Sequence, residues 1–402
     1  MPDLLIIGGG YAGLWAAMAA ARRAQDQAQD SAADLNIRLL SKDAYLTHRP
    51  RLYESNPQDM RTPLAPVLEP IGVGLEIAEV TAIDAPRRRV RARTEHGARE
   101  YSYDGLILAA GSVLRPPPME LVNARVWNVD NLAAAVELDQ HLKAVMATPK
   151  PAENGDTVVI IGAGFTGIEL AAEMRARLGE HGGAARAAAA RVILLDAAAT
   201  VGEDIGPGPR PHILEALQAA RVEVHLNAKI RRIEGDRIVL DDGGEIIAAT
   251  VIVTAGVQAN VLAAGLGLQT DAAGRLLVDA HLRVKGAPGL YAAGDMAHAL
   301  TDASHVALMS CQHAMPMGKF AGYNAASDLL NLAALPYAQP RYVTCLDLGS
   351  WGAVFSTGWD RQVEMIKAEA KARKQFVMTE VIYPPMHDRK AILAAGAMEP
   401  AP

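Results

Sequence analysis

The amino-terminal stretch constrains the fold most, because a short apolar run leads directly into a glycine turn. Residues 4–7 (Leu-Leu-Ile-Ile) are typical of a buried parallel strand, and an alanine-rich helix is expected to begin at Tyr11. Gly8 permits the tight turn, Gly10 lets the backbone approach a pyrophosphate, and Gly13 lets the helix pack closely on the strand. The phosphates would lie at the free N–H groups of the helix N-terminus, where the helix dipole favours negative charge.

The same pattern recurs at residues 157–170, where an apolar run precedes Gly162, Gly164 and Gly167. A single glycine turn between strand and helix also arises for packing reasons alone. Two of them in one chain predict two dinucleotide sites.

A carboxylate at the end of the next strand is expected to bind the adenosine ribose in each unit. After the second turn, the strand at 192–195 ends at Asp196, and an insert at 181–190 explains the long spacing from the turn. No arginine directly follows Asp196 to receive a 2′-phosphate, so we expect NAD(H) rather than NADP(H). The alternative is that Asp196 is a solvated strand end.

The first unit departs from this pattern. Its second strand, at 34–40, ends at Ser41 and Lys42, so Ser41 stands where the acid is expected and Asp43 is a candidate substitute. Arg49 follows shortly afterwards, and we favour contact with a phosphate over a solvated surface charge.

Composition excludes several classes of protein. A chain of 402 residues is long enough for two or three domains, and its net charge of −6 argues against a nucleic-acid partner. The two cysteines, Cys311 and Cys345, form no CxxC or CxxxxC pair, so neither a metal site nor a redox disulfide is expected. No apolar run reaches the roughly 18 residues of a membrane span, so we expect a cytoplasmic protein that is soluble or bound to a surface.

Periodicity and turn residues give a coarse map of the remaining elements. We expect helices at 11–29, 131–146, 309–332 and 360–376, and hairpins at 76–94 and 341–355. Further strands are expected at 222–226, 237–240 and 249–255, with a strand that ends in a small-residue turn at 103–112 and a short strand followed by Gly-Asp within 289–297. Proline-containing connectors are expected at 115–118 and 148–156.

Five motifs in a fixed order resemble the flavoproteins with two dinucleotide-binding folds. They are the first glycine turn at 8–13, the small-residue strand end at 106–112, the second turn at 162–167, Thr-Ala-Gly at 254–256, and Gly-Asp at 294–295. The resemblance implies an α/β protein with two Rossmann-like domains. An NAD domain (119–256) would be inserted in an FAD domain (1–118 and 257–335), followed by a small hairpin and helix segment (336–402).

The resemblance also implies which residues bind FAD and NADH. In this family Asp295 would bind the flavin ribityl chain, and the main chain of Val80 would touch the adenine. The full set of cofactor-binding residues is Gly8, Gly10, Tyr11, Ala12, Gly13, Ser41, Lys42, Arg49, Val80, Ala110, Gly111, Gly162, Gly164, Thr166, Gly167, Asp196, Gly256, Gly294 and Asp295. No metal ligands are expected.

Within that family the chain is most similar to the type II NADH dehydrogenases, because the paired cysteines of the disulfide reductases are absent. Glu169 matches a glutamate that contacts the nicotinamide in those enzymes, although it could simply favour the helix N-terminus electrostatically. Gln312 matches the first of two glutamines near the quinone, but Pro316 replaces the second. That replacement weakens the case for a quinone acceptor.

The resemblance therefore implies an oxidoreductase that passes hydride from NADH to FAD and then electrons to a quinone or another small acceptor. The alternatives are an NADH-dependent reductase of a small electron-carrier protein and an NADH-sensing flavoprotein similar to apoptosis-inducing factor. A thin apolar stripe on the charged helix at 360–376 is explained equally well by the chain's own core, by a homodimer, or by peripheral contact with the inner face of the cell membrane.

Overall fold

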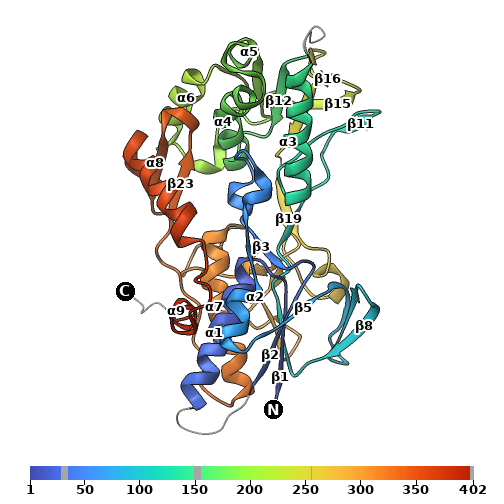
Figure 1. Cartoon of the computed structure of the whole chain (residues 1–402), viewed down its shortest axis with the longest axis vertical. Coiled ribbons are helices and arrows are strands. Elements are labelled where there is room, and N and C mark those ends of the chain that lie inside the picture. Colours follow the sequence, from blue (N-terminus) through green and yellow to red (C-terminus); the bar gives the residue numbers. More distant parts are fainter. Residues whose placement is uncertain (29–34, 149–154, 255, 399–402) are drawn as a thin grey trace.

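In the computed structural model, residues 1–28, 35–148, 155–254 and 256–398 are described. Four parts of the chain that the sequence analysis covers lie outside these ranges: most of the predicted connector at 148–156, Ala255 of the Thr-Ala-Gly motif, the last residue of the predicted first helix, and the last four residues. Figure 1 shows two lobes along the long axis, with the amino terminus at the far end of the lower lobe.

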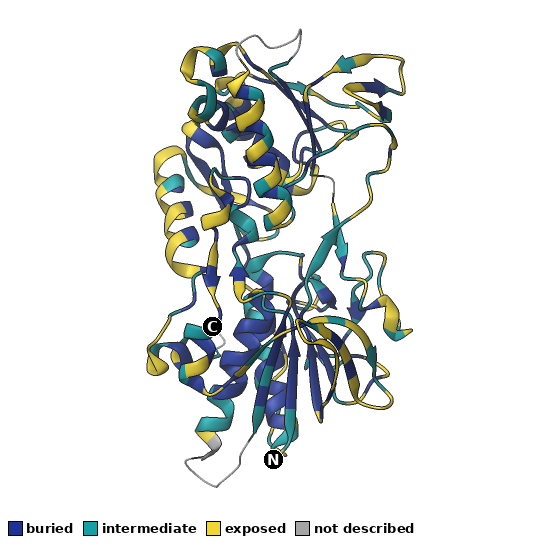
Figure 2. Cartoon of the chain, turned by 45° about the vertical axis from the view of Figure 1, so that its right-hand side comes forward, coloured by how far each residue is buried: buried dark blue, intermediate teal, exposed yellow. Residues whose placement is uncertain are grey.

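The lower lobe is built on a five-stranded parallel sheet in the order β21–β9–β1–β2–β5. Its strands are β1 (Asp3–Ile7), β2 (Asn36–Ser41), β5 (Gly74–Ile77), β9 (Gly105–Leu108) and β21 (Leu290–Ala292). The apolar runs of β1 and β9 are buried on both faces, as parallel strands require (Figure 2).

Helices α1 (Tyr11–Ala28) and α7 (Cys311–Leu329) pack closely in this lobe. A Cβ on Gly318 or Gly322 of α7 would lie 2.2 or 2.1 Å from a backbone oxygen of α1. Glycine is therefore required at both positions, and the small-residue face of α7 sets the helix spacing.

The upper lobe contains a second parallel sheet in the order β14–β13–β12–β18, so the predicted repetition of strand, glycine turn and helix is confirmed. Its strands are β12 (Thr157–Ile161), β13 (Arg191–Leu195), β14 (Val222–His225) and β18 (Thr250–Val253). Its helices are α3 (Leu132–Ala147), α4 (Phe165–Gly182), α5 (Ala184–Ala189) and α6 (Arg210–Ala219). A second, small sheet combines β11 (Glu120–Val122), β15 (Ile230–Glu234), β16 (Arg237–Leu240) and β17 (Glu245–Ile247).

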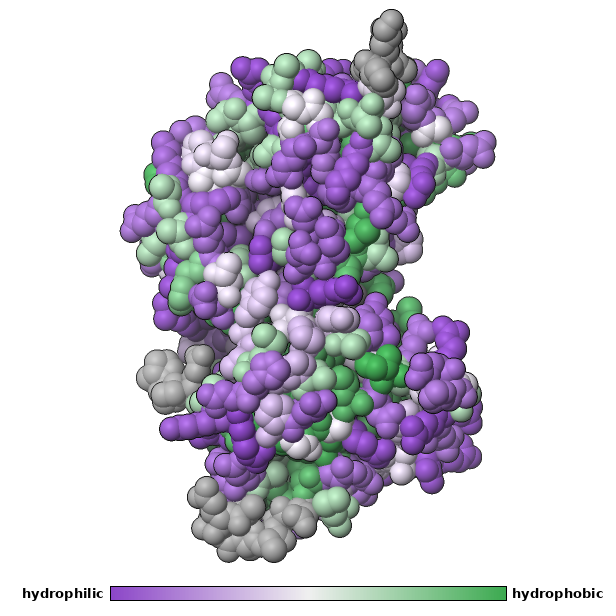
Figure 3. Space-filling model, in the orientation of Figure 1, coloured by the Kyte–Doolittle hydropathy of each residue, from purple (hydrophilic) through white to green (hydrophobic). Residues whose placement is uncertain are grey.

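The chain passes between the lobes along a narrow antiparallel ribbon of β10 (Ser112–Leu114) and β19 (Val257–Ala259) (Figure 1). The predicted domain limits, 118/119 and 256/257, lie close to this ribbon and stay a prediction. Figure 3 shows that the surface is mostly hydrophilic on this face, with hydrophobic residues gathered in and below the indentation on its right-hand side.

Smaller elements complete the lower lobe, and among them the sequence predicted the hairpin at 76–94 but not the other strands. These smaller elements are β3 (Tyr45–Thr47), β4 (Arg61–Pro63), α2 (Ala65–Leu68), β6 (Glu79–Asp84), β7 (Arg89–Thr94), β8 (Gly97–Ser102), β20 (Leu276–Leu277) and β22 (Ala297–His298).

The carboxy-terminal segment forms a three-stranded antiparallel sheet and two helices. They are β23 (Val343–Asp347), β24 (Ala353–Thr357), β25 (Gln362–Ile366), α8 (Lys367–Phe376) and α9 (Arg389–Ala395). The predicted hairpin is confirmed, but the helix predicted from residue 360 is wrong in its first part. Gly358 and Arg361 both have positive φ, which makes a tight turn, and the alternating sequence of β25 then continues the sheet.

This sheet lies along α4 of the upper lobe, where a Cβ on Gly349 would be 2.5 Å from the Ala172 oxygen. Helix α9 instead returns to the lower lobe, where Arg22 of α1 donates to the Leu393 oxygen at 3.2 Å. The carboxy-terminal segment thus contacts both lobes. Among the described residues, every helix is too short or too polar to cross a bilayer.

Candidate functional site

The first glycine turn connects β1 to α1 with the geometry that its sequence predicts. Gly8 has φ +113°, and a Cβ on Gly13 would lie 1.8 Å from the Gly8 oxygen, so neither position tolerates a side chain. Gly10 is different, because a Cβ there meets no protein atom within 4 Å. The turn therefore leaves open space beside the N-terminus of α1, which fits a bound pyrophosphate.

The second glycine turn, between β12 and α4, repeats this geometry. Gly162 has φ +107°, a Cβ on Gly167 would lie 1.8 Å from the Gly162 oxygen, and a Cβ on Gly164 meets nothing within 4 Å. The Thr254 hydroxyl donates to the oxygens of Ile161 and Gly162, both at 3.0 Å, which ties the end of β18 to the turn. Thr166 is exposed on the first turn of α4.

Asp196 lies at the end of β13, directly beside the second turn. One carboxylate oxygen accepts the backbone N–H of Ala163 within that turn, and the other accepts that of Ala198 at 2.7 Å. The carboxylate is thereby fixed at the rim of the turn, which is the position expected of a ribose-binding acid.

The corresponding place in the first unit has no room for an acid. Ser41 is buried, and its hydroxyl would be 2.5 Å from a Cβ on Gly9, so the turn packs directly on this small side chain. Asp43 is used locally, because it accepts the Tyr45 backbone N–H at 2.9 Å. Lys42 is exposed.

Arg49 and Asp295 meet in one polar cluster. Arg49 Nη2 lies 2.6 Å from Asp130 Oδ1, and its Nη1 lies 3.8 Å from Asp295 Oδ2 and donates to the Ser112 hydroxyl at 3.1 Å. Ser112 in turn donates to Asp295 at 2.6 Å, and burial raises the pKa of Asp295. Gly111, with φ +71°, faces Arg49. No local motif indicates Asp130, and Ser112, although it ends the motif at 106–112, was not predicted as a site residue.

The remaining predicted FAD residues surround the N-terminus of α1. A Cβ on Gly294 would lie 2.9 Å from that of Ala12, so the Gly-Asp motif contacts the helix closely. The Tyr11 hydroxyl lies 2.8 Å from His48 Nδ1. Burial, with a smaller contribution from Arg51, lowers the pKa of His48 to about 4, so the ring is neutral near pH 7.

Three other predicted positions lie on β6, beside the ribbon and at the end of β9, of which Ala110 is next to the first turn. Val80 is half-buried in β6, where it pairs with Ala92. Gly256 is exposed with φ +70° beside the ribbon, and half-buried Ala110 directly follows the buried Ala109 at the end of β9.

Glu169 is buried and held from the carboxy-terminal segment. Its Oε1 lies 2.7 Å from Lys374 Nζ and accepts the Asp347 backbone N–H at 3.0 Å. Burial outweighs these partners and raises the pKa of Glu169, while the pairing raises that of Lys374. Lys374 was missed, although a lysine on the predicted charged helix was an available signal.

Residues 2–318 match the protein family described as "Pyridine nucleotide-disulphide oxidoreductase". The chain belongs to this family. A NADH dehydrogenase-like protein of Mycobacterium tuberculosis is 41% identical to it over 397 residues, covering 99% of this chain and 98% of that protein. A type II NADH:quinone oxidoreductase of the same species is 31% identical, covering 73% of this chain and 66% of that protein.

Among solved structures, NDH2 of Plasmodium falciparum in complex with NADH superimposes with a TM-score of 0.79 at 12% identity. The match covers 98% of this chain and 97% of NDH2. At that identity the likeness shows the fold, which is that of flavoproteins with two dinucleotide-binding domains. The chain is thus an oxidoreductase with the predicted fold.

Gln312, at the start of α7, also contacts the carboxy-terminal segment of this oxidoreductase. Its Oε1 accepts the Val343 backbone N–H at 3.2 Å, and its own backbone oxygen accepts from Gln339 Nε2 at 3.1 Å. Cys311 and Cys345 are free thiols, and burial raises the pKa of each to about 11. Neither is therefore a reactive thiolate near pH 7.

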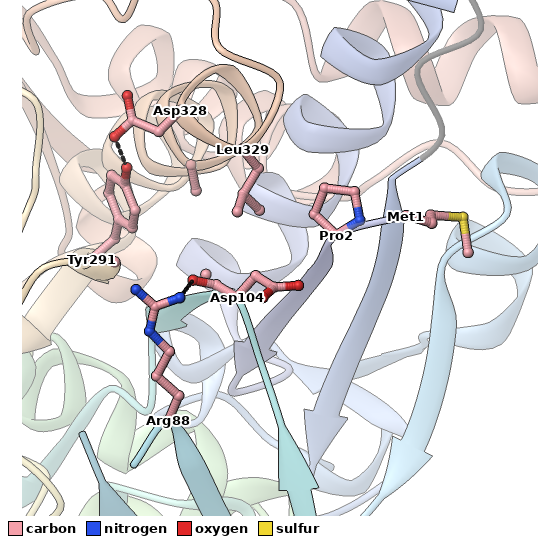
Figure 4. A pocket seen from close by; sticks show the side chains of 10 residues that line it. Met1, Pro2, Arg88, Asp104, Tyr291, Asp328 and Leu329 are labelled. Carbon is pink, nitrogen blue, oxygen red and sulfur yellow. Dashed lines mark hydrogen bonds between the residues drawn. The ribbon is translucent and has the colours of Figure 1, made fainter. Parts of the chain in front are cut away.

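A pocket of about 630 Å³ lies at the opposite edge of the lower sheet from the glycine turn (Figure 4). It is lined by residues that precede or begin the strands, including Met1, Pro2, Asp104 and Gly105, together with Asp328 of α7. Ligands of open parallel sheets bind at the carboxyl ends of the strands. This pocket is accordingly separate from the predicted cofactor sites.

Proposed function

We propose that the chain is an FAD-dependent NADH dehydrogenase that delivers electrons to a quinone-like acceptor. The observation that carries this proposal is the repetition of one glycine-turn geometry at the carboxyl ends of β1 and β12. The relatives named NADH dehydrogenase-like protein and type II NADH:quinone oxidoreductase support the choice of substrates.

The first turn and its surroundings would hold FAD. Open space at Gly10 fits the pyrophosphate, and the half-buried Asp295, which accepts a hydrogen bond from Ser112, is available to a ribityl hydroxyl. Arg49 would balance the charge of Asp295 and of the phosphates together. When bound, FAD accepts two electrons from NADH and passes them to a second substrate.

The second turn would hold NADH. Gly164 leaves space for the pyrophosphate at the N-terminus of α4, and Asp196 is fixed where it can accept a ribose hydroxyl. Ala197 follows Asp196, so a 2′-phosphate would meet a carboxylate and no adjacent cation. The chain therefore favours NADH over NADPH.

Glu169 and Gln312 would position the substrates. Glu169 Oε1 is occupied by Lys374 and Asp347, which leaves the carboxylate oriented for a nicotinamide amide at its other oxygen. Gln312 lies at the start of α7, where its amide side chain is suited to a quinone carbonyl. Both residues contact the carboxy-terminal segment, which would make that segment part of the acceptor site.

A quinone dissolved in lipid would require peripheral contact with a membrane. Phe376, Val381 and Met386, which are 49%, 44% and 41% exposed, lie at or beyond the end of the basic helix α8. We place the membrane contact on this face, at the cytoplasmic side of the cell membrane; a homodimer is the alternative use of the same surface.

The substitution Gln312→Leu tests the acceptor assignment by separating the two half-reactions. In anaerobic stopped-flow experiments, reduction of the bound flavin by NADH should stay within twofold of the parent, while reoxidation by menadione slows at least tenfold. Gln218→Leu, at an exposed position on α6, is the matched control and should change neither rate. If Gln312→Leu leaves both rates unchanged, Gln312 has no part in acceptor binding.

A further inference from the structure

Unpaired buried polar atoms are concentrated at one place in the described part of the chain. Five buried side-chain nitrogen or oxygen atoms have no hydrogen-bond partner, and four of them are Ser310 Oγ, His313 Nε2, Trp359 Nε1 and Arg361 Nη1. Such an atom destabilises the fold when it is left unpaired. Four of them together indicate a site that is built for a partner.

Three of these residues, His313, Trp359 and Arg361, surround the ring of Tyr342. The Trp359 ring stacks on it at 4.3 Å between centroids, the His313 ring lies at 5.4 Å, and the Arg361 guanidinium lies at 4.5 Å. Ser310 is the N-cap residue of α7, and its backbone oxygen accepts from the His313 N–H at 3.2 Å. We call Ser310, His313, Trp359 and Arg361 the unpaired cluster.

Arg361 is the most unusual member of the cluster electrostatically. Three cationic side chains are buried among the described residues. Arg177 lies 3.4 Å from Asp139, and Lys374 lies 2.7 Å from Glu169. Arg361, which is 6% exposed, has no carboxylate at ion-pair distance within the described ranges. Its guanidinium contacts the Tyr342 side chain and donates a long hydrogen bond, 3.4 Å, to the Asp204 backbone oxygen. A buried cation without a counter-charge is costly, so an anionic partner would stabilise it strongly.

His313 contributes an acceptor to the cluster. Its Nδ1 lies 3.0 Å from Gln339 Oε1, and the Gln339 orientation is fixed because its Nε2 donates to the Gln312 oxygen. Nδ1 therefore carries the proton, and Nε2 presents a lone pair. Burial lowers the pKa of His313 and keeps the ring neutral.

The cluster lies between the N-termini of two helices. Arg361 is 6.0 Å from the ring of Phe165, the first residue of α4, while Ser310 occupies the N-cap position of α7 without a side-chain cap hydrogen bond. Both helix dipoles present their positive ends here. The nearby Asp302 is engaged with His305, whose ring stacks on the other side of Trp359 at 4.4 Å.

We propose that Arg361 and Trp359 bind the oxyanion of a small ligand and that His313 accepts a hydrogen bond from the same ligand, with the Trp359 turn as a movable cover. Arg361 Nη1 and Trp359 Nε1 would donate to a phosphate, carboxylate or sulfonate oxygen, and His313 Nε2 would accept from a hydroxyl or amide of the same ligand. The turn at 358–361 contains two residues with positive φ and exposed positions at Gly358 and Asp360, while its Arg361 end packs closely against Gly208. Its movement is required, because the four atoms are inaccessible while the rings are stacked.

This inference deepens the proposed function, because the oxyanion would belong either to the phosphates of NADH or to the electron acceptor. The test uses the yellow holoprotein and follows ligand binding by the fluorescence of Trp359. The Trp359 signal is obtained by subtracting the fluorescence of Trp359→Phe from that of the parent. ADP-ribose probes the phosphate source without reducing the flavin. Naphthoquinone sulfonate, compared with neutral menadione, probes the acceptor source.

Arg361→Gln should weaken binding of one of the two anionic probes at least tenfold, while Arg361→Lys, which keeps the charge, weakens it less. Menadione affinity should change less than twofold. If Arg361→Gln loses ADP-ribose binding, the site belongs to the dinucleotide. If Arg361→Gln loses the preference for naphthoquinone sulfonate over menadione, the site belongs to the electron acceptor. If both anionic probes bind Arg361→Gln within threefold of the parent, the proposal is overturned.

A measurement on the parent alone covers the case in which Arg361→Gln fails to fold. Sodium sulfate should change the Trp359 fluorescence and compete with the anionic probe, whereas sodium chloride at equal ionic strength should not. Equal effects of the two salts would overturn the oxyanion site. Reduction of the parent by NADH and reoxidation by menadione are measured separately, so the proposed function can hold when the oxyanion site fails.

Discussion

The substitution Gly164→Val separates nucleotide binding at the second glycine turn from the stability of the turn itself. Gly164 is the N-cap residue of α4 with φ −81° and ψ −171°, an extended backbone that valine adopts without strain. A Cβ at this position meets no protein atom within 4 Å. The valine side chain should therefore leave the fold intact and occupy the space expected of the NADH pyrophosphate.

The expected loss of affinity follows from the hydrogen bonds that the phosphates would lose. Charge-assisted hydrogen bonds contribute about 1.5–3 kcal/mol each, so displacing two of them costs at least about 3 kcal/mol, or roughly a hundredfold in affinity. Gly164→Val should keep the circular dichroism spectrum and FAD content of the parent. The NADH concentration that half-reduces the flavin should rise at least about a hundredfold, while dithionite still reduces it fully.

Gly167→Ala provides the contrasting control in the same turn. Its Cβ would lie 1.8 Å from the Gly162 oxygen, so the strand and helix must separate, and the protein should lose thermal stability. If Gly164→Val binds NADH within threefold of the parent, or if it unfolds as Gly167→Ala does, the geometry does not describe a dinucleotide site.

Three further predictions follow from other parts of the structure. Gly10→Val, which places a side chain in open space at the first turn, should give folded protein without flavin; an FAD content equal to the parent would refute the assignment. Burial lowers the His48 pKa from 6.5 to about 4, so between these pH values the unfolded ring binds a proton that the folded ring excludes. His48 therefore lowers the free energy of unfolding by at most about 3 kcal/mol as the pH falls from 6.5 to 4. His48→Asn should show a smaller drop in melting temperature over that range, and an equal drop would contradict the sign of this effect. Lys374→Met leaves the buried Glu169 unpaired and should destabilise the protein by about 3–5 kcal/mol in urea unfolding, with partial recovery when Glu169→Gln is added; no recovery would show that the pair is not coupled.

The parts of the fold that depend on neighbouring residues were predictable from the sequence. The glycine turn fixes its own backbone, so the helix expected at Tyr11 begins at that residue, and the repeated turn begins α4 in the same way. Asp196 could be placed because it directly follows a buried strand. These predictions needed only residues that lie close together in the chain.

Pairings between distant segments could not be predicted. Glu169 and Lys374 are 205 positions apart, and Arg49 and Asp130 are 81 apart, so no local pattern connects them. β25 was hidden because its alternating sequence precedes a charged helix, and because Arg361, which turns the chain, is not a residue type that favours positive φ. The geometry of the two glycine turns could be predicted from the sequence, whereas the contacts of the carboxy-terminal segment with Glu169 and Gln312 could not.

The electron acceptor is the central claim, and anaerobic steady-state turnover of the parent tests it most directly. NADH oxidation is measured with soluble quinones and, in parallel, with small electron-carrier proteins, while the flavin absorbance is recorded. We predict that NADH bleaches the flavin, that quinones restore its absorbance, and that kcat/KM is higher for a quinone than for any carrier protein. A flavin that NADH leaves unchanged, or turnover that carrier proteins support and quinones do not, would contradict the account.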